Sequence, residues 1–180
     1  MIYETTPIND VYIINSYNSI DQRGKFVKTY NKNFFIKNKF DIDIRESYYS
    51  LSNNNVIRGL HFQLPPHDHH KLVYVCSGSI IDVIIDLRQE SSTFKKIFSV
   101  KLTSKNNKSI LIPKGIAHGF RSLEDNTITV YNVTSEYNSE NDSGILYDSF
   151  GFDWRINKPI ISERDMSFES LNSFLLKKIF

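Results

Sequence analysis

The sequence predicts an all-β sandwich or barrel, and three observations point to that class. Short runs rich in valine, isoleucine, tyrosine, phenylalanine and threonine dominate the chain. Asparagine, glycine, serine and proline separate these runs, as turn residues do between short strands. Of the 180 residues 40% are hydrophobic, with a net charge of only +2, so the chain can bury a sizeable core. We expect a single domain over residues 1–180.

The runs that read as strands follow one another through most of the chain. In order they are "DVYIINSY", "KFVKTY", "IRESYYSLS", "VIRGLHFQ", "KLVYVCSG", "SIIDVIIDLR", "KIFSVKLT", "SILIPKG" and "TITVYNVTSEY". The run "SIIDVIIDLR" is apolar on both faces except at Asp82 and Asp86. A strand that is apolar on both faces is buried on both sides, so this run is predicted to be a central strand.

Two helices complete the prediction. The segment 31–40 is short and carries a modest apolar stripe. The segment 167–180 starts at a serine and ends near Lys177 and Lys178, which suit a helix C-terminus. Its apolar residues at helical spacing are Phe168, Leu171, Phe174 and Leu175.

Composition argues against several classes of protein. Lysine and arginine form no strong basic run, so neither nucleic acid nor a membrane is expected as the main partner. No apolar run approaches the roughly 20 residues of a membrane span, and no segment has signal-peptide form, so we expect a soluble, cytoplasmic protein. The single cysteine, Cys76, cannot form an internal disulfide, and its apolar surroundings predict a buried, inert thiol.

A dense group of histidines raises the question of a metal site. His61, His67, His69 and His70 all lie in "GLHFQLPPHDHHKLVYV", residues 59–75. His67 and His69 have the H-x-H spacing of the first metal motif of cupins, and "PKGIAH" at 113–118 resembles the second cupin motif. The first motif also needs a glutamate, but no glutamate follows before Gly78, and a metal site wants at least three ligands.

The residue that follows the histidines is Lys71, whose ammonium would repel a divalent ion. No metal is therefore predicted. We interpret "HDHH" as a polar loop with solvated imidazoles, and a weak or adventitious metal site is the alternative.

Longer motifs extend the resemblance. The chain looks like the dTDP-4-dehydrorhamnose 3,5-epimerase family from "DQRGKFVKTYN" (21–31) to about Phe168, through "VIRGLHFQLPP", "KLVYVCSGSIIDVIIDLRQESSTF", "LIPKGIAHGF", "TVYNVTSEY" and "ISERD". The resemblance implies a metal-free, cupin-type jelly-roll β-sandwich that forms a homodimer. It also implies epimerisation of C3 and C5 of a nucleotide-activated 4-keto-6-deoxy sugar, for surface polysaccharide.

The chemistry of such a reaction can be stated without the family. A 4-keto group acidifies the C–H bonds at C3 and C5, so a base must remove each proton and a donor must hold the enolate oxygen. An acid on the opposite face of the ring must return a proton, or no inversion occurs. The reaction needs no redox cofactor and no metal, and none is predicted.

The resemblance assigns the catalytic roles. His61 in "RGLH" matches the base, Asp165 in "SERD" matches the carboxylate that orients it, and Tyr131 matches the acid on the far face. Lys71 matches a cation near the sugar oxygens and is the better candidate for stabilising the enolate. Without the family, His61 would be a structural histidine, Tyr131 a packing residue and Asp165 the N-cap of the last helix.

The resemblance also implies the residues that hold the substrate. These are Arg23, Arg58, His118, Tyr137, Asp142 and Arg164, with Tyr137 matching the aromatic ring that stacks on the base. The nucleotide end departs from the family: its usual glutamate is Lys28, and its Gln-Asp-Asn stretch is Glu46, Ser47 and Tyr48. A carboxylate at Glu46 could accept from the amino groups of cytosine or guanine, so the base need not be thymine. An ion pair between Lys28 and Glu46 is the plainer alternative.

Three other functions stay open at this level. One is a mono-epimerase, for C3 or C5, acting on a CDP- or GDP-linked 4-keto hexose or heptose. Another is a metal-dependent cupin such as a dioxygenase, and the last is a non-catalytic sugar-binding jelly roll. The implied homodimer would place Arg23 and Lys28, in the N-terminal segment, near the neighbouring subunit's nucleotide site.

Overall fold

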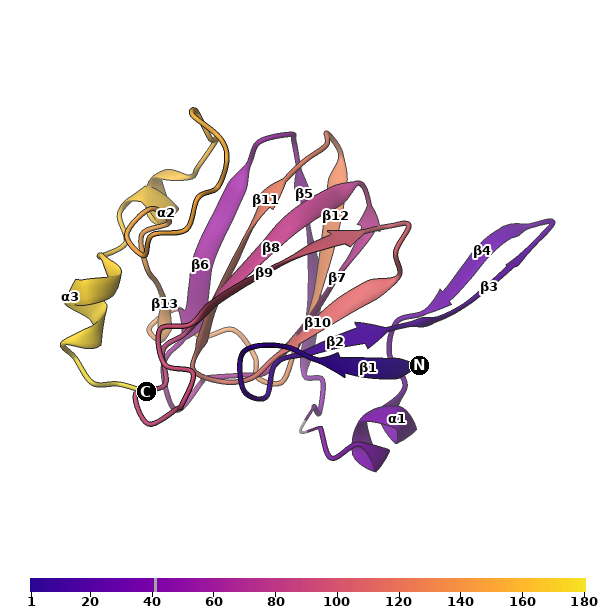
Figure 1. Cartoon of the computed structure of the whole chain (residues 1–180), viewed down its shortest axis with the longest axis horizontal. Helices are drawn as coiled ribbons and strands as arrows, with labels where there is room; N and C mark the ends of the chain where they lie inside the picture. Colours follow the sequence, from indigo (N-terminus) through magenta and orange to yellow (C-terminus); the bar gives the residue numbers. More distant parts are fainter. Residues whose placement is uncertain (41) are drawn as a thin grey trace.

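Two antiparallel sheets pack face to face in the computed structural model, which describes residues 1–40 and 42–180 (Figure 1). The six-stranded sheet has the order β1 (Ile2–Thr5), β2 (Tyr12–Asn15), β10 (Lys108–Ile112), β7 (Lys71–Ser77), β12 (Thr127–Val133) and β5 (Glu46–Ser52). The five-stranded sheet has the order β13 (Asp142–Gly144), β6 (Ile57–Gln63), β11 (Ile116–Ser122), β8 (Ser79–Asp86) and β9 (Ile97–Thr103). The predicted all-β sandwich of jelly-roll type is confirmed.

Strand β8 contributes to two hydrophobic cores, one between the two sheets and one on the outer face of the five-stranded sheet. Its even-numbered apolar residues, Ile80 and Ile84, are fully buried in the core between the two sheets. The alternate residues Val83 and Ile85 belong to a second core on the outer face, under the C-terminal segment. Strands β11 and β9 flank β8, so the prediction of a central strand is confirmed.

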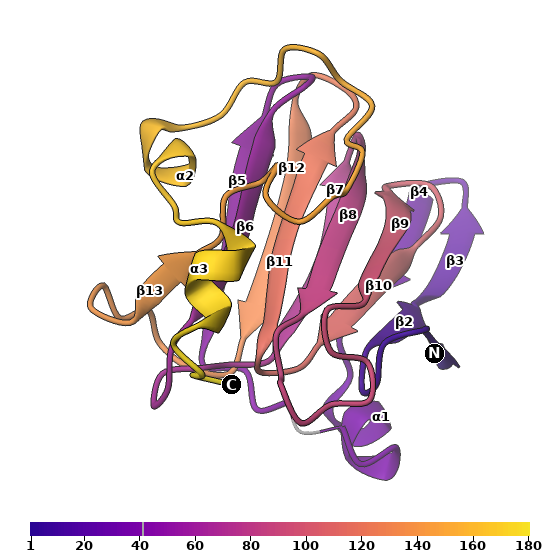
Figure 2. The ribbon, with the colours of Figure 1, turned by 60° about the vertical axis from the view of Figure 1, so that its left-hand side comes forward.

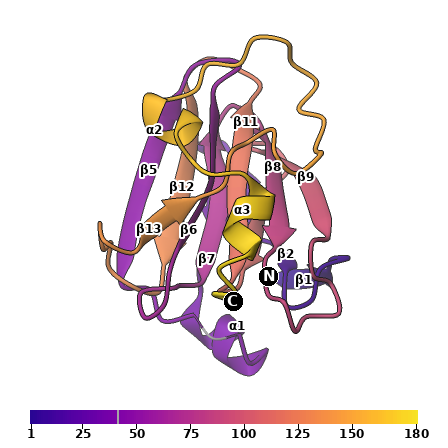
Figure 3. The same ribbon diagram turned by 90° about the vertical axis from the view of Figure 1, so that its left-hand side faces the viewer.

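The C-terminal segment covers the outer face of the five-stranded sheet, where α3 lies across it (Figures 2 and 3). The predicted C-terminal helix is present, but its predicted extent over 167–180 is too long. Within this segment the structure has a short helix, α3 (Leu171–Leu175), and a second short helix, α2 (Glu163–Met166), ends just before the segment begins. The side chain of Ser170 accepts from the N–H of Ser173 and starts α3, so the residues just before Ser170 are free to link the two helices.

The N-terminal helix is present but shorter than expected. It is α1 (Lys32–Lys37), begun by Asn31, whose side chain accepts from the N–H of Phe34. Phe35 is buried with Leu72 and Leu111 on the outer face of the six-stranded sheet. None of the helices in residues 1–40 and 42–180 is long and apolar enough to cross a membrane.

A hairpin of β3 (Tyr17–Asp21) and β4 (Gly24–Lys28) projects away from the sandwich (Figure 1). It carries three exposed apolar side chains: Tyr17 is 53% exposed, Ile20 is 75% exposed and Phe26 is 57% exposed. The hairpin therefore leaves apolar surface exposed outside the sandwich.

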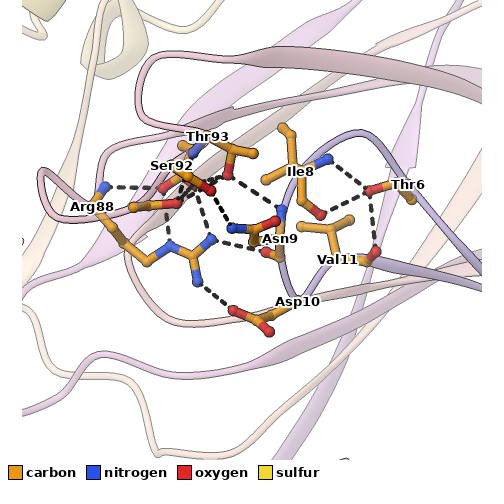
Figure 4. Close-up of polar contacts among 10 residues, drawn as sticks. Thr6, Ile8, Asn9, Asp10, Val11, Arg88, Ser92 and Thr93 are labelled. Atoms are coloured by element: carbon orange, nitrogen blue, oxygen red, sulfur yellow. Dashed lines mark hydrogen bonds and ion pairs between the residues drawn. The ribbon is translucent and has the colours of Figure 1, made fainter.

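The cluster drawn in Figure 4 ties the N-terminal loop to the end of β8. Asp86 is fully buried and accepts from Arg88 through both carboxylate oxygens, at 2.9 Å each. The same guanidinium donates to the carbonyl of Asn9 at 2.8 Å and pairs with Asp10 at 3.0 Å. Burial raises the pKa of Asp86, but the bonds from Arg88, Thr93 and Ser91 outweigh it and hold that pKa below its usual value. Asp86 therefore anchors a loop and has no part in the cavity described below.

The prediction of a buried Cys76 is wrong, because its side chain is exposed. Along β7 the side chains of Val73 and Val75 face the core, while Leu72 and Cys76 lie on the outer face. The outer face is covered around Leu72 by α1 and its neighbours, and that cover does not reach Cys76.

Candidate active site

A cavity of about 360 Å³ opens between the two sheets, within the size range of small-molecule sites. Strands β5, β7 and β12 contribute Glu46, Tyr48, Lys71 and Tyr131 to one wall. Strands β6 and β11 contribute Arg58, His61 and His118 to the other. The C-terminal part of the chain adds Tyr137, Asp142 and Arg164. Most of the residues that the sequence predicts for catalysis or substrate binding therefore line this one cavity.

His61 and Asp165 form a paired imidazole and carboxylate. Nε2 of His61 lies 2.8 Å from Oδ1 of Asp165, and the N–H of Gly59 donates to Oδ2 at 2.9 Å. Burial raises the pKa of Asp165, yet the bonds from His61 and Gly59 outweigh it and lower that pKa. Asp165 lies inside α2, which Ser162 caps, and the last helix, α3, is capped by Ser170, so the interpretation of Asp165 as the cap of the last helix is wrong.

The imidazole of His61 is a neutral base near pH 7. Burial lowers its pKa, and the cations of Lys71 and Arg164 add to that effect, while the bond to Asp165 opposes it. Because the carboxylate of Asp165 accepts a hydrogen bond from the N–H at Nε2, the lone pair of the neutral imidazole lies on Nδ1. A neutral imidazole fixed in this tautomer can accept a proton from carbon.

An irregularity in β6 turns both Arg58 and His61 toward the cavity. In a regular strand, side chains three residues apart point to opposite faces. The register of β6 with β11 shifts between His118 and Phe120, beside Gly59. Gly59 has φ +129°, and a Cβ there would lie 2.5 Å from Cα of Gly119. Only glycine fits this bulge, so Gly59 is required for the side chains of Arg58 and His61 to point into the same cavity.

Phe168 packs against the imidazole of His61, a contact that the sequence does not reveal because Phe168 falls on the apolar stripe of the predicted helix. Its ring centroid lies 5.7 Å from that of His61, edge to face. The guanidinium of Arg164 lies 5.1 Å from the centroid of the Phe168 ring. A Cβ at Gly144 would lie 2.5 Å from this ring, so the glycine in β13 makes room for it. The ring of Phe168 thus packs beside the His61 imidazole, whose side chain remains 28% exposed.

Tyr131 approaches the cavity from the opposite sheet. It faces Tyr48 across β12 and β5, and the two rings stack at 4.9 Å with 19° between their planes. Its hydroxyl lies 3.2 Å from Oγ of Ser50. Burial raises the pKa of Tyr131 above its usual range and raises the pKa of Tyr48 to about 12, so both phenols stay protonated at neutral pH. A protonated phenol is a proton donor.

Lys71 extends from β7 toward β6 across the cavity, and 7% of its surface is exposed. Its ammonium donates to the backbone carbonyl of His61 at 3.2 Å. Burial lowers its pKa to about 8, although the carboxylates of Asp142 and Asp82 counter that effect. At neutral pH the group is a buried cation, which can bind a developing negative charge.

His118 is held from behind by Asp82, the polar residue within the apolar strand β8. Nε2 of His118 lies 2.7 Å from Oδ2 of Asp82, and both side chains are buried. The sequence singled out Asp82 only as an interruption of an apolar run. The pairing explains why a carboxylate is kept inside the core.

His69 corrects the interpretation of "HDHH" as a solvated loop. Its side chain is 8% exposed, lines the cavity, and has Nδ1 2.9 Å from Oγ of Ser135. Burial lowers the pKa of His69 to about 3, so the ring is neutral. Within the described part of the chain, no group of three or more histidine, cysteine, aspartate or glutamate side chains could hold a metal ion.

Three expected substrate residues lie away from the cavity. Arg23 is exposed at the tip of the hairpin and pairs with Asp21 at 2.6 Å. Lys28 lines a separate small cavity beside Tyr17 and Phe34. Ser47 faces the other side of β5, as alternation along a strand requires, and donates to Oδ1 of Asn132 at 2.7 Å.

The carboxylate of Glu46 accepts from the backbone N–H of Tyr137 at 2.8 Å. Lys28 and Glu46 form no ion pair within residues 1–40 and 42–180, so the structure does not support that alternative inside one chain.

An imidazole and a phenol on opposite walls of one cavity suit an epimerase, an isomerase that removes a proton on one side of a ring and returns one on the other. The family model for dTDP-4-dehydrorhamnose 3,5-epimerase matches residues 5–173. The chain belongs to the dTDP-4-dehydrorhamnose 3,5-epimerase family.

Individual relatives agree with this membership. The dTDP-4-dehydrorhamnose 3,5-epimerase of Methanothermobacter thermautotrophicus is 37% identical over 92% of this chain and 92% of its own length. That of Salmonella typhimurium is 34% identical over 98% of each chain. The crystal structure of the Bacillus anthracis enzyme, with TDP and PPi bound, is 35% identical with a TM-score of 0.91, covering 94% of this chain and 99% of that one. The Legionella pneumophila enzyme, in complex with dTDP-4-keto-L-rhamnose, is 30% identical with a TM-score of 0.88, covering 97% and 96%.

Proposed function

We propose that this chain, as a single jelly-roll domain, inverts C3 and C5 of a dTDP-linked 4-keto-6-deoxy sugar of the 4-dehydrorhamnose type. The observation that carries the proposal is the placement of His61 with Asp165 on one wall and Tyr131 on the opposite wall. The nucleotide sugars named in the structures of the relatives support the choice of substrate class. Such a product would serve the synthesis of surface polysaccharide.

Proton removal begins the reaction at each carbon. Nδ1 of His61 takes the proton from the carbon next to the ketone, and the electron pair of the C–H bond moves to the ketone oxygen as an enolate. Asp165 stabilises the imidazolium that results. The Lys71 ammonium binds the enolate oxygen in a site where water is scarce, and loss of one such donor typically costs about 2.7–4 kcal/mol of barrier.

Proton return from the other face completes the inversion. The Tyr131 hydroxyl donates to the carbon while the enolate collapses to the ketone, which leaves the phenolate to regain a proton from solvent. The His61 imidazolium releases its proton to solvent before the second carbon reacts. Ser50, 3.2 Å from the hydroxyl, is suited to relay that proton. Arg58 and His118 would contact the diphosphate and sugar oxygens, and Tyr137 would stack on the base.

A nucleotide diphosphate sugar is a polyanion that does not cross a bilayer unaided, so the proposal puts the enzyme in the cytoplasm with its substrate.

Turnover of a dTDP-linked 4-keto-6-deoxy sugar as a function of pH tests the proposal. Because burial lowers the pKa of Lys71 to about 8, kcat/KM should fall about tenfold per pH unit as the pH rises above 8. The ammonium is lost in that window while the base stays neutral. The Lys71→Met variant should lose roughly 10²- to 10³-fold in rate and should no longer show this alkaline limb. No turnover by the wild-type protein would reject the function, and an unchanged limb in the variant would reject the role of Lys71.

We also propose that the enzyme is a homodimer in which each hairpin of β3 and β4 completes the other subunit's site. The exposed apolar side chains of the hairpin and the distance of Arg23 and Lys28 from the cavity in their own chain support this. In the dimer, Arg23 and Lys28 of the second subunit would supply positive charge to the nucleotide end of the cavity.

A subunit-mixing experiment tests the exchange of hairpins. Neither His61→Ala nor the double variant Arg23→Ala, Lys28→Ala should be active alone. A dimer formed from one chain of each has one intact site, so unfolding and refolding an equal mixture should restore about one quarter of wild-type activity by random pairing. Sedimentation should show twice the 21.0 kDa mass of the chain. An inactive mixture of properly formed dimers would contradict the exchange.

A further inference from the structure

The segment 134–141 crosses from one sheet to the other at the mouth of the cavity. It leaves the end of β12 in the six-stranded sheet and enters β13 beside β6 in the five-stranded sheet. The N–H of Thr134 donates to the carbonyl of His70 at 3.2 Å, and the N–H of Leu64 donates to the carbonyl of Asn141 at 2.8 Å. Both ends of the segment are thus fixed, and Tyr137 stands between them with 61% of its surface exposed.

Two side chains of the cavity wall hold consecutive backbone N–H groups of this segment. Oε2 of Glu46, on β5, accepts from the N–H of Tyr137 at 2.8 Å. Oε1 of Gln63, on β6, accepts from the N–H of Asn138 at 3.0 Å. One acceptor comes from each sheet, so the backbone of Tyr137 is fixed relative to both walls of the cavity.

The acceptor from β6 is itself fixed. Gln63 is 5% exposed, and its Nε2 lies 3.3 Å from Nδ1 of His69. His69 in turn lies beside Ser135, which belongs to the same segment and donates to the carbonyl of His67 at 2.9 Å. The neighbours of Gln63 therefore set the orientation of its amide. Glu46 is the second acceptor of this segment, and it is less buried than Gln63.

We infer that Glu46 is a positioning residue for Tyr137, not a reader of the nucleobase. The inference rests on the proposed function, in which Tyr137 stacks on the base. It needs an acceptor at position 46 and no negative charge, so a glutamine there should serve almost as well. The hydroxyl of Tyr137 lies 3.4 Å from Oδ2 of Asp142, which steadies the other end of the ring.

Amide hydrogen exchange of the ligand-free protein tests the hold directly. In Glu46→Ala the amide of Tyr137 should exchange at least about tenfold faster, whereas in Glu46→Gln it should stay within about twofold of wild type. Glu136→Ala is the matched control, since it removes an exposed carboxylate from the same segment and should leave the exchange unchanged. Equal exchange in wild type and Glu46→Ala would overturn the inference.

Calorimetric binding of dTDP tests the consequence. Glu46→Ala should weaken the Kd about tenfold, and Glu46→Gln should remain within about threefold of wild type. In a Tyr137→Ala background, Glu46→Ala should cause no further loss, because the residue acts through that ring. In turnover measurements Glu46→Ala should raise KM and leave kcat little changed.

Two results would overturn the inference in favour of a base-reading carboxylate. One is a loss in Glu46→Ala that adds fully to that of Tyr137→Ala. The other is a switch of nucleotide preference among dTDP, CDP and GDP in Glu46→Gln. Failure of the wild-type protein to bind dTDP would count against the proposed function, and the exchange experiment would still decide whether Glu46 holds Tyr137.

Discussion

His61→Ala is expected to lower epimerisation by roughly 10³-fold, since general-base catalysis contributes about 10²- to 10⁴-fold. Without the imidazole, no group on that wall can accept the proton from carbon, and Asp165 is left with the Gly59 N–H and the cation of Arg164. Deuterium from heavy water should then enter neither C3 nor C5 of the sugar. The measurement is mass spectrometry of the recovered nucleotide sugar.

A matched histidine controls for folding and for general damage. His67 lies in the nearby loop, outside the cavity lining, so His67→Ala should retain turnover and deuterium uptake. Uptake at either carbon by His61→Ala at a rate near wild type would show that another group is the base.

Tyr131→Phe should have a different signature, which separates the acid from the base. The variant keeps the ring that stacks on Tyr48 and loses only the hydroxyl. His61 can still remove and return protons on its own face, so deuterium uptake should stay within about tenfold of wild type. Formation of inverted product should fall roughly 10²-fold or more, because no donor remains on the far face. NMR of the product gives its configuration alongside the deuterium content.

Tyr49→Phe is the corresponding control. Tyr49 neighbours Tyr48 on the same strand but is 70% exposed and faces away from the cavity, so its hydroxyl should not matter for inversion. Inversion at the wild-type rate in Tyr131→Phe would remove the tyrosine from the mechanism and leave the structure without an assigned acid.

Much of the fold could be predicted because local patterns and packing agree. The two apolar faces of "SIIDVIIDLR" identified β8 as an interior strand, and both faces are indeed buried. The C-terminal helix was misjudged because helical spacing over 167–180 competes with a serine cap at Ser170, and the cap decides where the helix begins. The exposure of Cys76 depends on how far the cover from α1 extends, which no local pattern records.

Motifs predicted most of the residues that line the candidate site, but they did not predict how these residues come together. Strand alternation alone would place Arg58 and His61 on opposite faces, and the bulge at Gly59 brings them together. The burial of His69 depends on Ser135, which is 66 residues away in sequence. Phe168 reaches His61 only because Gly144 leaves space for its ring. Each of these contacts is made by tertiary packing between residues far apart in the chain, which the periodicity of the sequence does not reveal.

In the proposed reaction one active site removes a proton on one face of the sugar and returns one on the other. The decisive experiment is incubation of the wild-type protein in heavy water with a dTDP-linked 4-keto-6-deoxy sugar. Deuterium should appear at both C3 and C5, together with inversion at both carbons. Absence of deuterium at both carbons, under conditions where the protein is folded and binds dTDP, would rule this reaction out.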